Sequence, residues 1–531
     1  MDYSRVYNKR NIIFLPAIAA LIIALIPTLK YQWPLGWDII YHIQYAQVYA
    51  HQGFTTITPL LNAPTGQKIG YPPLFHFLIA AIGTGLNVDF FQVARFLQPV
   101  LAASIVLSVS YVAYKFYGNI AGLGAGFLML SSMLMGRMIL TLPENLALVF
   151  LPLAVYFYYR SLKEKDYKIA ILGGILLLLV MATHQAATLC LVLAIVSITI
   201  MELVVYRNFK ALGNFLSFFL ILIVLGILGV IGLLVVAPQV VESLWQQGIT
   251  AITGMSTSLT FNRPLGIYSY LGNLGIMVLV FATIGGIFTL KKHQQKDNVI
   301  LAWIISMILL SNAYWFGINV ITYRVLIYLL IPLSILGGYG IHITCQKLKN
   351  YPRFSSKKVR TTILIAICAL SMVSSVLIVT DPDISVFSVK NEFGNVQIAP
   401  PSDAEVDLAN WFNENGNKSR SLVISNQFTG MFLTSTAQMP MNYGFEFYST
   451  KTYPNMTLET IKKDGVGYLV YDKRLVVPEE DSWLRVMSIT SEFFPLYYFS
   501  QNITTHFDQI KPDYATKIYE NQDFIVCKVD Y

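Results

Sequence analysis

Residues 213–237 read GNFLSFFLILIVLGILGVIGLLVVA and include no Asp, Glu, Lys or Arg. A helix needs ~20 apolar residues to cross the hydrocarbon core of a bilayer, so this stretch predicts a membrane span. Ten other stretches have the same character: 11–29, 90–114, 119–136, 145–159, 169–183, 186–205, 267–290, 298–316, 321–345 and 361–380. The sequence therefore predicts a polytopic α-helical membrane protein with about eleven transmembrane helices.

The composition of the 531-residue chain agrees with a lipid environment. Hydrophobic residues make up 55% of it and charged residues 12%, whereas about 25% of a soluble protein is charged. The four cysteines are scattered, three of them in apolar stretches, so they indicate neither a disulfide framework nor a metal cluster. These features exclude a cytosolic enzyme, a disordered chain and a secreted disulfide scaffold.

The charge is distributed unevenly along the chain. Residues 1–380 hold 25 Lys and Arg against 9 Asp and Glu, a net charge of +16, and residues 381–531 hold 12 against 20, a net charge of −8. The basic excess belongs to the apolar part, where it is typical of cytoplasmic loops. We therefore expect membrane lipids as partners and no nucleic acid.

The stretch YPPLFHFLIAAIGTGL, residues 71–86, decides the orientation. If it does not span and the N-terminus is cytoplasmic, 19 of the 25 basic residues of 1–380 fall in cytoplasmic loops. Counting it as a span reverses that bias, against the positive-inside rule. We expect a multi-pass protein of the cell membrane with 71–86 as an interfacial or re-entrant helix inside a first external loop, 30–89. The C-terminal residues are then extracytoplasmic.

The residues after the last predicted span change character. SLVIS at 421–425, GYLVY at 467–471 and FIVCKV at 524–529 predict buried strands, and the run from Asp403 to Gly416 predicts an amphipathic helix. The sequence thus predicts a C-terminal external soluble α/β domain, 382–531, after a transmembrane domain, 1–381.

Acidic residues near a membrane are costly and are therefore candidates for function. With the orientation above, only Asp38, Asp89, Glu144 and Glu242 of 1–380 are external. Asp38 precedes His42 by four residues, so the two side chains share one face of a predicted interfacial helix. A helix-capping role for Asp38 and a structural role for His42 remain the alternatives.

The other candidates lie in later external segments. Glu144 follows Pro143 and comes seven residues after Arg137. Arg324 heads an otherwise uncharged span, and a guanidinium group offers a bidentate fork to phosphate oxygens. The alternatives are a helix-dipole role for Glu144, headgroup snorkelling for both arginines and a solvated loop for Glu242.

Acids and guanidinium groups at one membrane face suit chemistry on a lipid-linked, phosphate-bearing substrate. Asp38 and Glu144, with Glu242 as a further candidate, could hold Mg²⁺ or Mn²⁺ against a phosphate. Alternatively, one carboxylate could act as general base on an acceptor. Arg324 would stabilise the charge that develops on the leaving phosphate.

The order of these features resembles the GT-C superfamily of membrane glycosyltransferases, and within it the catalytic subunits of bacterial and archaeal oligosaccharyltransferases. The resemblance runs from about 11 to 350, with a looser similarity in layout to 531. Asp38, in GWDIIYH, matches the family's Asp in the first external loop, and His42 completes an Asp-x-x-x-His found in archaeal members. The resemblance implies a GT-C-like catalytic domain over 1–381 and inversion at the anomeric carbon.

Two further family motifs have counterparts here. The pair Arg137 and Glu144 keeps the spacing of an Arg followed by an acid in the second external loop, with Glu in place of Asp. Tyr323-Arg324-Val325 resembles the helix start whose Arg contacts the donor phosphate, and the resemblance implies donor contacts for Arg324, Arg137 and His42. Glu242 is the acid available in the long external loop.

One family motif is missing. The W-W-D motif reads the Ser or Thr of an acceptor sequon, and the corresponding stretch, Ser425-Asn426-Gln427-Phe428, has neither tryptophan nor acid. We therefore expect a glycosyltransferase that takes a sugar from a dolichyl or undecaprenyl phosphate or diphosphate carrier and transfers it to a glycan or protein acceptor. The alternatives are a protein N-oligosaccharyltransferase with a degenerate acceptor site, a transporter or flippase for a lipid-linked sugar, and a structural protein.

Overall fold

The structure, a computed structural model, describes residues 10–236, 264–318, 320–354, 356–380, 401–442, 457–475, 484–488, 495–499, 507–508 and 510–531. Backbone contacts divide the chain into two compact units. The helical unit is made of Met1–Leu29, Pro72–Phe75 and Leu97–Ser385, and the mixed unit of Lys30–Tyr71, His76–Phe96 and Val386–Tyr531. This grouping joins most of the first predicted external loop to the C-terminal residues, whereas the domain boundary at 381/382 stays a prediction.

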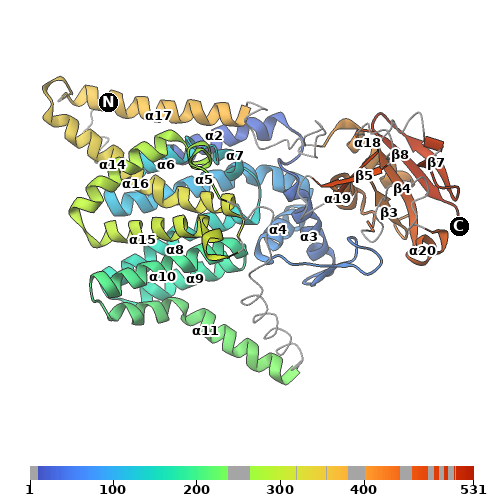
Figure 1. Cartoon of the computed structure of the whole chain (residues 1–531), viewed down its shortest axis with the longest axis horizontal. Helices are drawn as coiled ribbons and strands as arrows, with labels where there is room; N and C mark the ends of the chain where they lie inside the picture. The colour runs from blue at the N-terminus through green and yellow to red at the C-terminus, as the bar shows by residue number, and fades with distance from the viewer. Residues whose placement is uncertain are drawn as a thin grey trace. The chain divides into compact units, whose positions relative to one another are not determined.

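The helical unit is built almost entirely of helices (Figure 1). They are η1 (Arg10–Phe14), α2 (Leu15–Lys30), α5 (Phe90–Tyr117), α6 (Asn119–Leu130), α7 (Met135–Met138), α8 (Pro143–Glu164), α9 (Tyr167–Met181), α10 (Gln185–Val205), α11 (Lys210–Val236), α13 (Ile267–Leu274), α14 (Ile276–Lys292), α15 (Gln295–Ser311), η2 (Ala313–Phe316), η3 (Thr322–Arg324), α16 (Val325–Lys347), η4 (Leu348–Asn350), η5 (Pro352–Phe354) and α17 (Lys357–Thr380).

Seven helical stretches of the described chain are long and apolar enough to cross a membrane. They are Asn11–Lys30, Phe90–Tyr117, Pro143–Glu164, Gln185–Val205, Lys210–Ile231, Thr322–Asn350 and Lys357–Thr380. The pair α13 and α14, bent by 101°, would make an eighth span. These apolar helices identify a membrane protein.

The count of eleven spans stays a prediction. Expected spans 119–136, 169–183 and 298–316 correspond to α6, α9 and α15, which are 12, 15 and 17 residues long. At 1.5 Å per residue these helices reach at most about 26 Å, less than the ~30 Å hydrocarbon core. The stretch 71–86 forms α4 (Leu74–Leu86), which is also short, at 13 residues.

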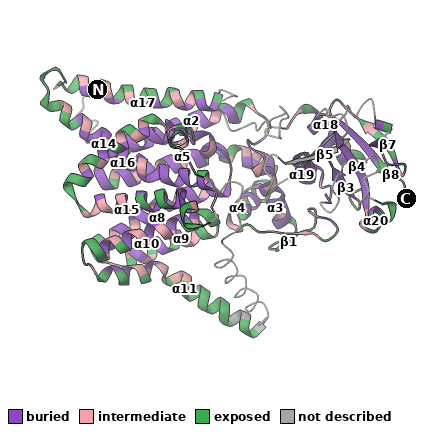
Figure 2. Ribbon diagram, in the orientation of Figure 1, coloured by how far each residue is buried: buried purple, intermediate pink, exposed green. Residues whose placement is uncertain are grey.

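Among the seven candidate spans, the one that contains α16 is the most deeply buried, and Figure 2 shows α16 largely in the colour of buried residues. Helix α16 packs against α6 and α14 through small residues. A Cβ atom at Gly338 would collide with the carbonyl oxygen of Ala121 on α6, and one at Gly340 with that of Phe281 on α14. Such close packing of small residues is how helices associate within a membrane. Helix α11, by contrast, exposes most of its apolar side chains, as a lipid-facing helix does.

The mixed unit contains both helices and strands. Its elements are α3 (Asp38–Gln52), β1 (Ile57–Thr58), β2 (Gln67–Lys68), most of α4, the first turns of α5, α18 (Asp403–Asn415), β3 (Ser421–Ile424), α19 (Gln427–Ala437), α20 (Leu458–Lys463), β4 (Val466–Asp472), β5 (Leu484–Ser488), β6 (Pro495–Phe499), β7 (Ala515–Glu520) and β8 (Phe524–Val529).

A four-stranded sheet in the order β3-β4-β8-β7 organises the C-terminal residues. Strands β3 and β4 are parallel, and the β4–β8 and β8–β7 pairs are antiparallel. These include the three strands expected from the apolar runs, and their core side chains are buried, among them Val423, Leu469 and Ile525. That these residues form a separate external domain stays a prediction.

Local sequence signals set the helix starts of this unit. Ser402 and Glu405 form a reciprocal capping box at the start of α18. Asn426 caps α19 by accepting hydrogen bonds from the backbone N–H groups of Phe428 and Thr429. Helix α19 packs against α3, so the first predicted external loop and the C-terminal residues share one core.

Candidate functional site

Arg137 and Glu144 form an ion pair in the helical unit. Arg137 lies on the short helix α7, and Glu144 is the second residue of α8, whose first position is taken by Pro143. Arg137 Nε donates to Glu144 Oε2 at 2.7 Å, and Nη2 lies 2.5 Å from the same oxygen. The Glu144 side chain is 3% exposed and that of Arg137 is 22% exposed. The two residues that share the seven-residue spacing are thus ion-paired, with the carboxylate buried.

The segment between the two residues is held by Asn145. Its Nδ2 group donates to the carbonyl oxygens of Arg137, Met138 and Leu140, at 2.8, 3.2 and 2.6 Å. Asn145 is fully buried. The backbone between α7 and α8 is irregular, so its carbonyl groups lack the hydrogen bonds of a continuous helix. The Asn145 amide donates hydrogen bonds to them instead. Asn145 therefore fixes the path that brings Arg137 back onto Glu144.

Tyr328 supplies the second partner of Glu144. It lies in the first turn of α16 and is almost completely buried. Its hydroxyl donates to Glu144 Oε1 at 2.9 Å and lies 3.2 Å from His184 Nδ1. Each Glu144 oxygen therefore has a partner, Arg137 on one and Tyr328 on the other. Tyr328 was not singled out from the sequence, although it follows the candidate Arg324 by four residues.

His184 stands at the N-terminus of α10, where its Nδ1 accepts from the backbone N–H of Ala187 at 3.3 Å. Burial lowers the pKa of His184 below its usual value of 6.5, against the opposing charge of Glu144, and the charges of Arg137 and Arg324 lower it further. Burial disfavours the charged imidazolium form. The imidazole is therefore neutral at pH 7.

Arg324 is the last residue of η3, directly before α16, and is half-buried. It lies four residues before Tyr328, so the two side chains are on one helical face. Its charge acts on His184, as does that of Arg137. The helical unit therefore gathers Arg137, Glu144, His184, Arg324 and Tyr328 around the N-terminal ends of α8, α10 and α16.

Asp38 and His42 belong to the mixed unit. Asp38 is the first residue of α3 and is half-exposed, whereas His42 is buried one turn later. His42 Nδ1 lies 3.0 Å from His76 Nε2, and the ring of Tyr71 meets the His42 ring edge-on at 4.8 Å. His76 was missed, because the stretch 71–86 was considered only for its apolar length. The shared role of Asp38, Glu144 and Arg324 stays a prediction, because Asp38 lies in a different unit from the other two.

The expected metal ligands find limited support. Among the described residues no three His, Cys, Asp or Glu side chains gather as a metal site, and Glu242 lies outside those residues. Both Glu144 oxygens already have partners, and a cation there would also meet the positive charge of Arg137. The Glu144 carboxylate therefore fits the partner of an arginine better than an Mg²⁺ or Mn²⁺ ligand.

The stretch that corresponds to the acceptor-reading motif has a structural role. Asn426 is 2% exposed, and its Nδ2 donates to Asp472 Oδ2 at 2.8 Å while its Oδ1 caps α19. Asp472 is bound in turn by Arg474 Nη2 at 2.7 Å. These groups satisfy one another within the mixed unit, so the polar atoms of Asn426 are committed to holding α19 and β4 together.

Comparison of the structure with solved structures gives its fold. The Archaeoglobus fulgidus oligosaccharyltransferase, in the apo form, aligns with a TM-score of 0.62 and 14% identity over 88% of this chain and 70% of that chain. ArnT from Cupriavidus metallidurans, in the apo state, aligns with a TM-score of 0.60 and 10% identity over 97% of each chain. The mycobacterial arabinofuranosyltransferase AftD aligns with a TM-score of 0.54 and 12% identity over 98% of this chain and 42% of that chain.

These three proteins are GT-C glycosyltransferases, and the chain has their fold. The archaeal enzyme has also been solved with Zn and sulfate, and with an inhibitory peptide and a dolichol-phosphate. ArnT has been solved with undecaprenyl phosphate. No protein-family profile and no curated protein sequence matches the chain. At 10–14% identity the likeness lies in the fold rather than in the sequence.

Proposed function

We propose that the chain is a membrane glycosyltransferase that moves a sugar from a polyprenyl phosphate or diphosphate carrier to an acceptor on the external face of the membrane. The fold supports this, because it is shared with transferases solved in complex with dolichol-phosphate and with undecaprenyl phosphate. The observation that carries the proposal is the group formed by Arg137, Glu144, Tyr328 and His184 beside Arg324.

This group has the properties of a phosphate site at a helix end. One carboxylate balances one of its two guanidinium groups, and His184, on which both guanidinium charges act, is neutral. Arg324 stands at the N-terminus of α16, where the helix dipole also favours an anion. Arg324 directly precedes a helix that is buried along its length. Arg324 is therefore the clamp for the carrier phosphate, and Glu144 and Tyr328 position Arg137.

In the proposed reaction an acceptor oxygen or nitrogen attacks the anomeric carbon of the donor sugar. The bond between that carbon and the carrier phosphate oxygen breaks, and its electron pair leaves on the phosphate. Asp38 takes the proton from the acceptor as general base. Arg324 stabilises the departing phosphate, because its charge is fixed in place before the reaction. Attack opposite to the leaving group inverts the anomeric configuration.

The acceptor is proposed to be something other than an Asn-x-Ser/Thr sequon. The support is Asn426, whose polar atoms are already used by Asp472 and by the α19 backbone. A protein N-oligosaccharyltransferase remains the second candidate, because one aligned structure is an oligosaccharyltransferase tethered to a sequon peptide.

The test is transfer in proteoliposomes that contain the full chain and a radiolabelled polyprenyl-phosphate sugar. We expect Asp38→Asn to abolish transfer while binding of the donor persists. Asp403→Asn is the matched control, because Asp403 also opens a helix of the mixed unit and is exposed. Wild-type turnover by Asp38→Asn would refute the assignment, and labelling of a sequon peptide would favour the second candidate.

A further inference from the structure

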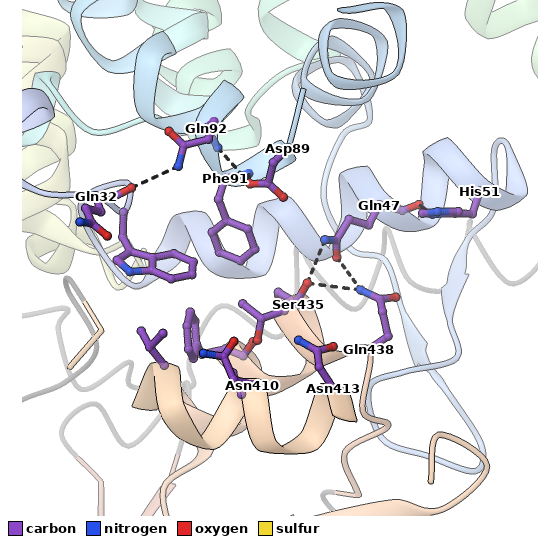
Figure 3. Close-up of a pocket in the computed structure, with 15 residues that line it drawn as sticks. Gln32, Gln47, His51, Asp89, Phe91, Gln92, Asn410, Asn413, Ser435 and Gln438 are labelled. Carbon is purple, nitrogen blue, oxygen red and sulfur yellow. Dashed lines mark hydrogen bonds between the residues drawn. The ribbon is translucent and has the colours of Figure 1, made fainter. Parts of the chain in front are cut away.

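A cavity of about 490 Å³ lies within the mixed unit (Figure 3). Its walls come from the segment before α3, the last turns of α3, the start of α5, and helices α18 and α19. Small-molecule sites have volumes of about 300–1,000 Å³. The cavity is therefore large enough for a ligand of a few rings.

The polar lining is rich in neutral amides. They are the side chains of Gln32, Gln47, Gln92, Asn410, Asn413 and Gln438. An amide both donates and accepts hydrogen bonds, and so does a hydroxyl group. A surface of amides therefore complements a ligand with many hydroxyl groups, whether each hydroxyl donates or accepts a hydrogen bond.

The lining includes one Asp and one His side chain, each with one atom already in a hydrogen bond. Asp89 Oδ1 accepts from the backbone N–H groups of Phe91 and Gln92, at 2.9 and 3.2 Å. His51 Nδ1 lies 2.7 Å from the carbonyl oxygen of Gln47. None of the described lining residues is Lys or Arg. This lining disfavours a phosphate or carboxylate ligand, whereas Arg137 and Arg324 in the helical unit favour one.

Some of the amides are fixed and others face solvent. Gln47 Nε2 donates to the Ser435 carbonyl oxygen at 2.8 Å, and Gln438 Nε2 donates to Gln47 Oε1 at 3.0 Å. Asn410 and Asn413 stand exposed along one side of α18 (Figure 3). The structure shows no hydrogen bond from their amides to another described residue. The fixed pair shapes the wall, and the two asparagines can bind a ligand without losing an internal bond.

An aromatic wall completes the cavity. The Trp33 ring meets Phe91 and Phe432 edge-on, with centroids 5.2 and 5.1 Å away. Aromatic side chains offer broad apolar faces of fixed geometry. The C–H face of a pyranose ring can pack on such a wall while its hydroxyl groups meet the amides.

We propose that this cavity binds a neutral saccharide. The saccharide would be part of the acceptor or of the donor glycan, and this role rests on the proposed function. Binding itself requires no transfer, so it can be measured even if the chain proves to have another activity.

The experiment is saturation-transfer difference NMR on the purified full chain in detergent. The probes are triacetylchitotriose, mannotriose and maltotriose, with trigalacturonic acid as the anionic control. We expect at least one neutral trisaccharide to receive saturation and the anionic one to receive none. Absence of signal from all three neutral probes, or equal signal from the anionic one, overturns the proposal.

A matched pair of variants locates the binding. Asn413→Trp fills the cavity from α18, whereas Asn415→Trp makes the same change on the opposite side of that helix, outside the cavity lining. We expect at least a tenfold loss of saccharide signal with the first and none with the second, at equal melting temperatures. The double variant Asn410→Ala/Asn413→Ala gives a second test if the tryptophan disturbs folding. Unchanged binding in Asn413→Trp and in the double variant overturns the assignment of the cavity.

Transfer kinetics then separate the two sources of the saccharide. A raised KM for the acceptor in Asn413→Trp indicates the acceptor glycan, and a raised KM for the donor indicates the carrier-linked glycan. Binding of an unglycosylated sequon peptide that is lost in Asn413→Trp, with no binding of any trisaccharide, would make the cavity a peptide site and overturn the proposal.

Discussion

Tyr328 donates its hydroxyl hydrogen to Oε1 of Glu144 at 2.9 Å, although 184 residues of sequence separate them. The contact joins the start of α16 to the start of α8. It also leaves Glu144 with a partner on each oxygen, so the carboxylate holds Arg137 in one orientation. Four experiments test the roles of these residues.

The first concerns Tyr328→Phe, which removes the hydroxyl and keeps the ring. A buried carboxylate oxygen then loses its donor, at a cost of about 1–3 kcal/mol in the free energy of unfolding. We expect kcat for sugar transfer to fall by up to ~100-fold, because a shift of Arg137 of even 1 Å is costly. Tyr339→Phe on the same helix is the control, since its hydroxyl accepts from Lys292 instead. Equal kcat values for the two variants would contradict a positioning role for Tyr328.

The second concerns the ion pair of Arg137 and Glu144. Glu144→Gln alone leaves a partly buried guanidinium without its carboxylate, and breaking a buried pair costs about 3–5 kcal/mol. The double variant Arg137→Met/Glu144→Gln leaves no such charge and should be less destabilised than the sum of the single variants. A double-mutant cycle on thermal unfolding measures this coupling, which we expect at about 1–3 kcal/mol. Additive effects would show that the pair is not coupled.

The third concerns Arg324. Arg324→Lys keeps the charge but loses the two-pronged geometry that suits a phosphate. Loss of one charge-assisted hydrogen bond costs about 1.5–3 kcal/mol, so we expect KM for the polyprenyl-phosphate donor to rise ~10- to 100-fold. KM for the acceptor should stay constant. An unchanged donor KM in Arg324→Lys would show that Arg324 does not bind the phosphate. Arg95→Lys, elsewhere in the chain, is the control.

The fourth concerns pH. Burial lowers the pKa of His184 in the folded chain below 6.5, so the unfolded chain binds more protons between the two pKa values. The stability from neutral His184 is complete above about pH 6.5 and is lost as the pH falls towards the folded pKa. We therefore expect the melting temperature to fall on acidification. The slope of melting temperature against pH should be smaller in His184→Asn, which keeps a good helix cap.

The matched control for that measurement is His293→Asn. His293 is exposed and has a left-handed backbone conformation, with φ of 49°, which asparagine tolerates well. We expect its slope to equal that of the unchanged protein. If His184→Asn behaves in the same way, His184 does not cause the acid sensitivity.

Much of this protein follows from local patterns in its sequence. Apolar runs of sufficient length predict the long helices, since lipid leaves a chain few other ways to satisfy its backbone. The strand FIVCKV matches β8 (Phe524–Val529), because a run of buried β-formers is visible in any single strand. The sequence also singled out Arg137 and Glu144 by their seven-residue spacing, and the structure added the hydrogen bond between them.

Only the tertiary structure determined what lies between distant segments. Tyr328 lies in an apolar stretch and His184 beside one. The hydrogen bond from Tyr328 to Glu144 and the approach of Tyr328 to His184 leave no periodic trace in the sequence. The amide-lined cavity joins residues near 32, 47 and 92 to others near 410 and 438, so no one stretch carries its pattern. The physical reason is the same in both cases: helix and strand formation depend on neighbours along the chain, whereas a site depends on which side chains the packing of those elements brings within hydrogen-bonding distance.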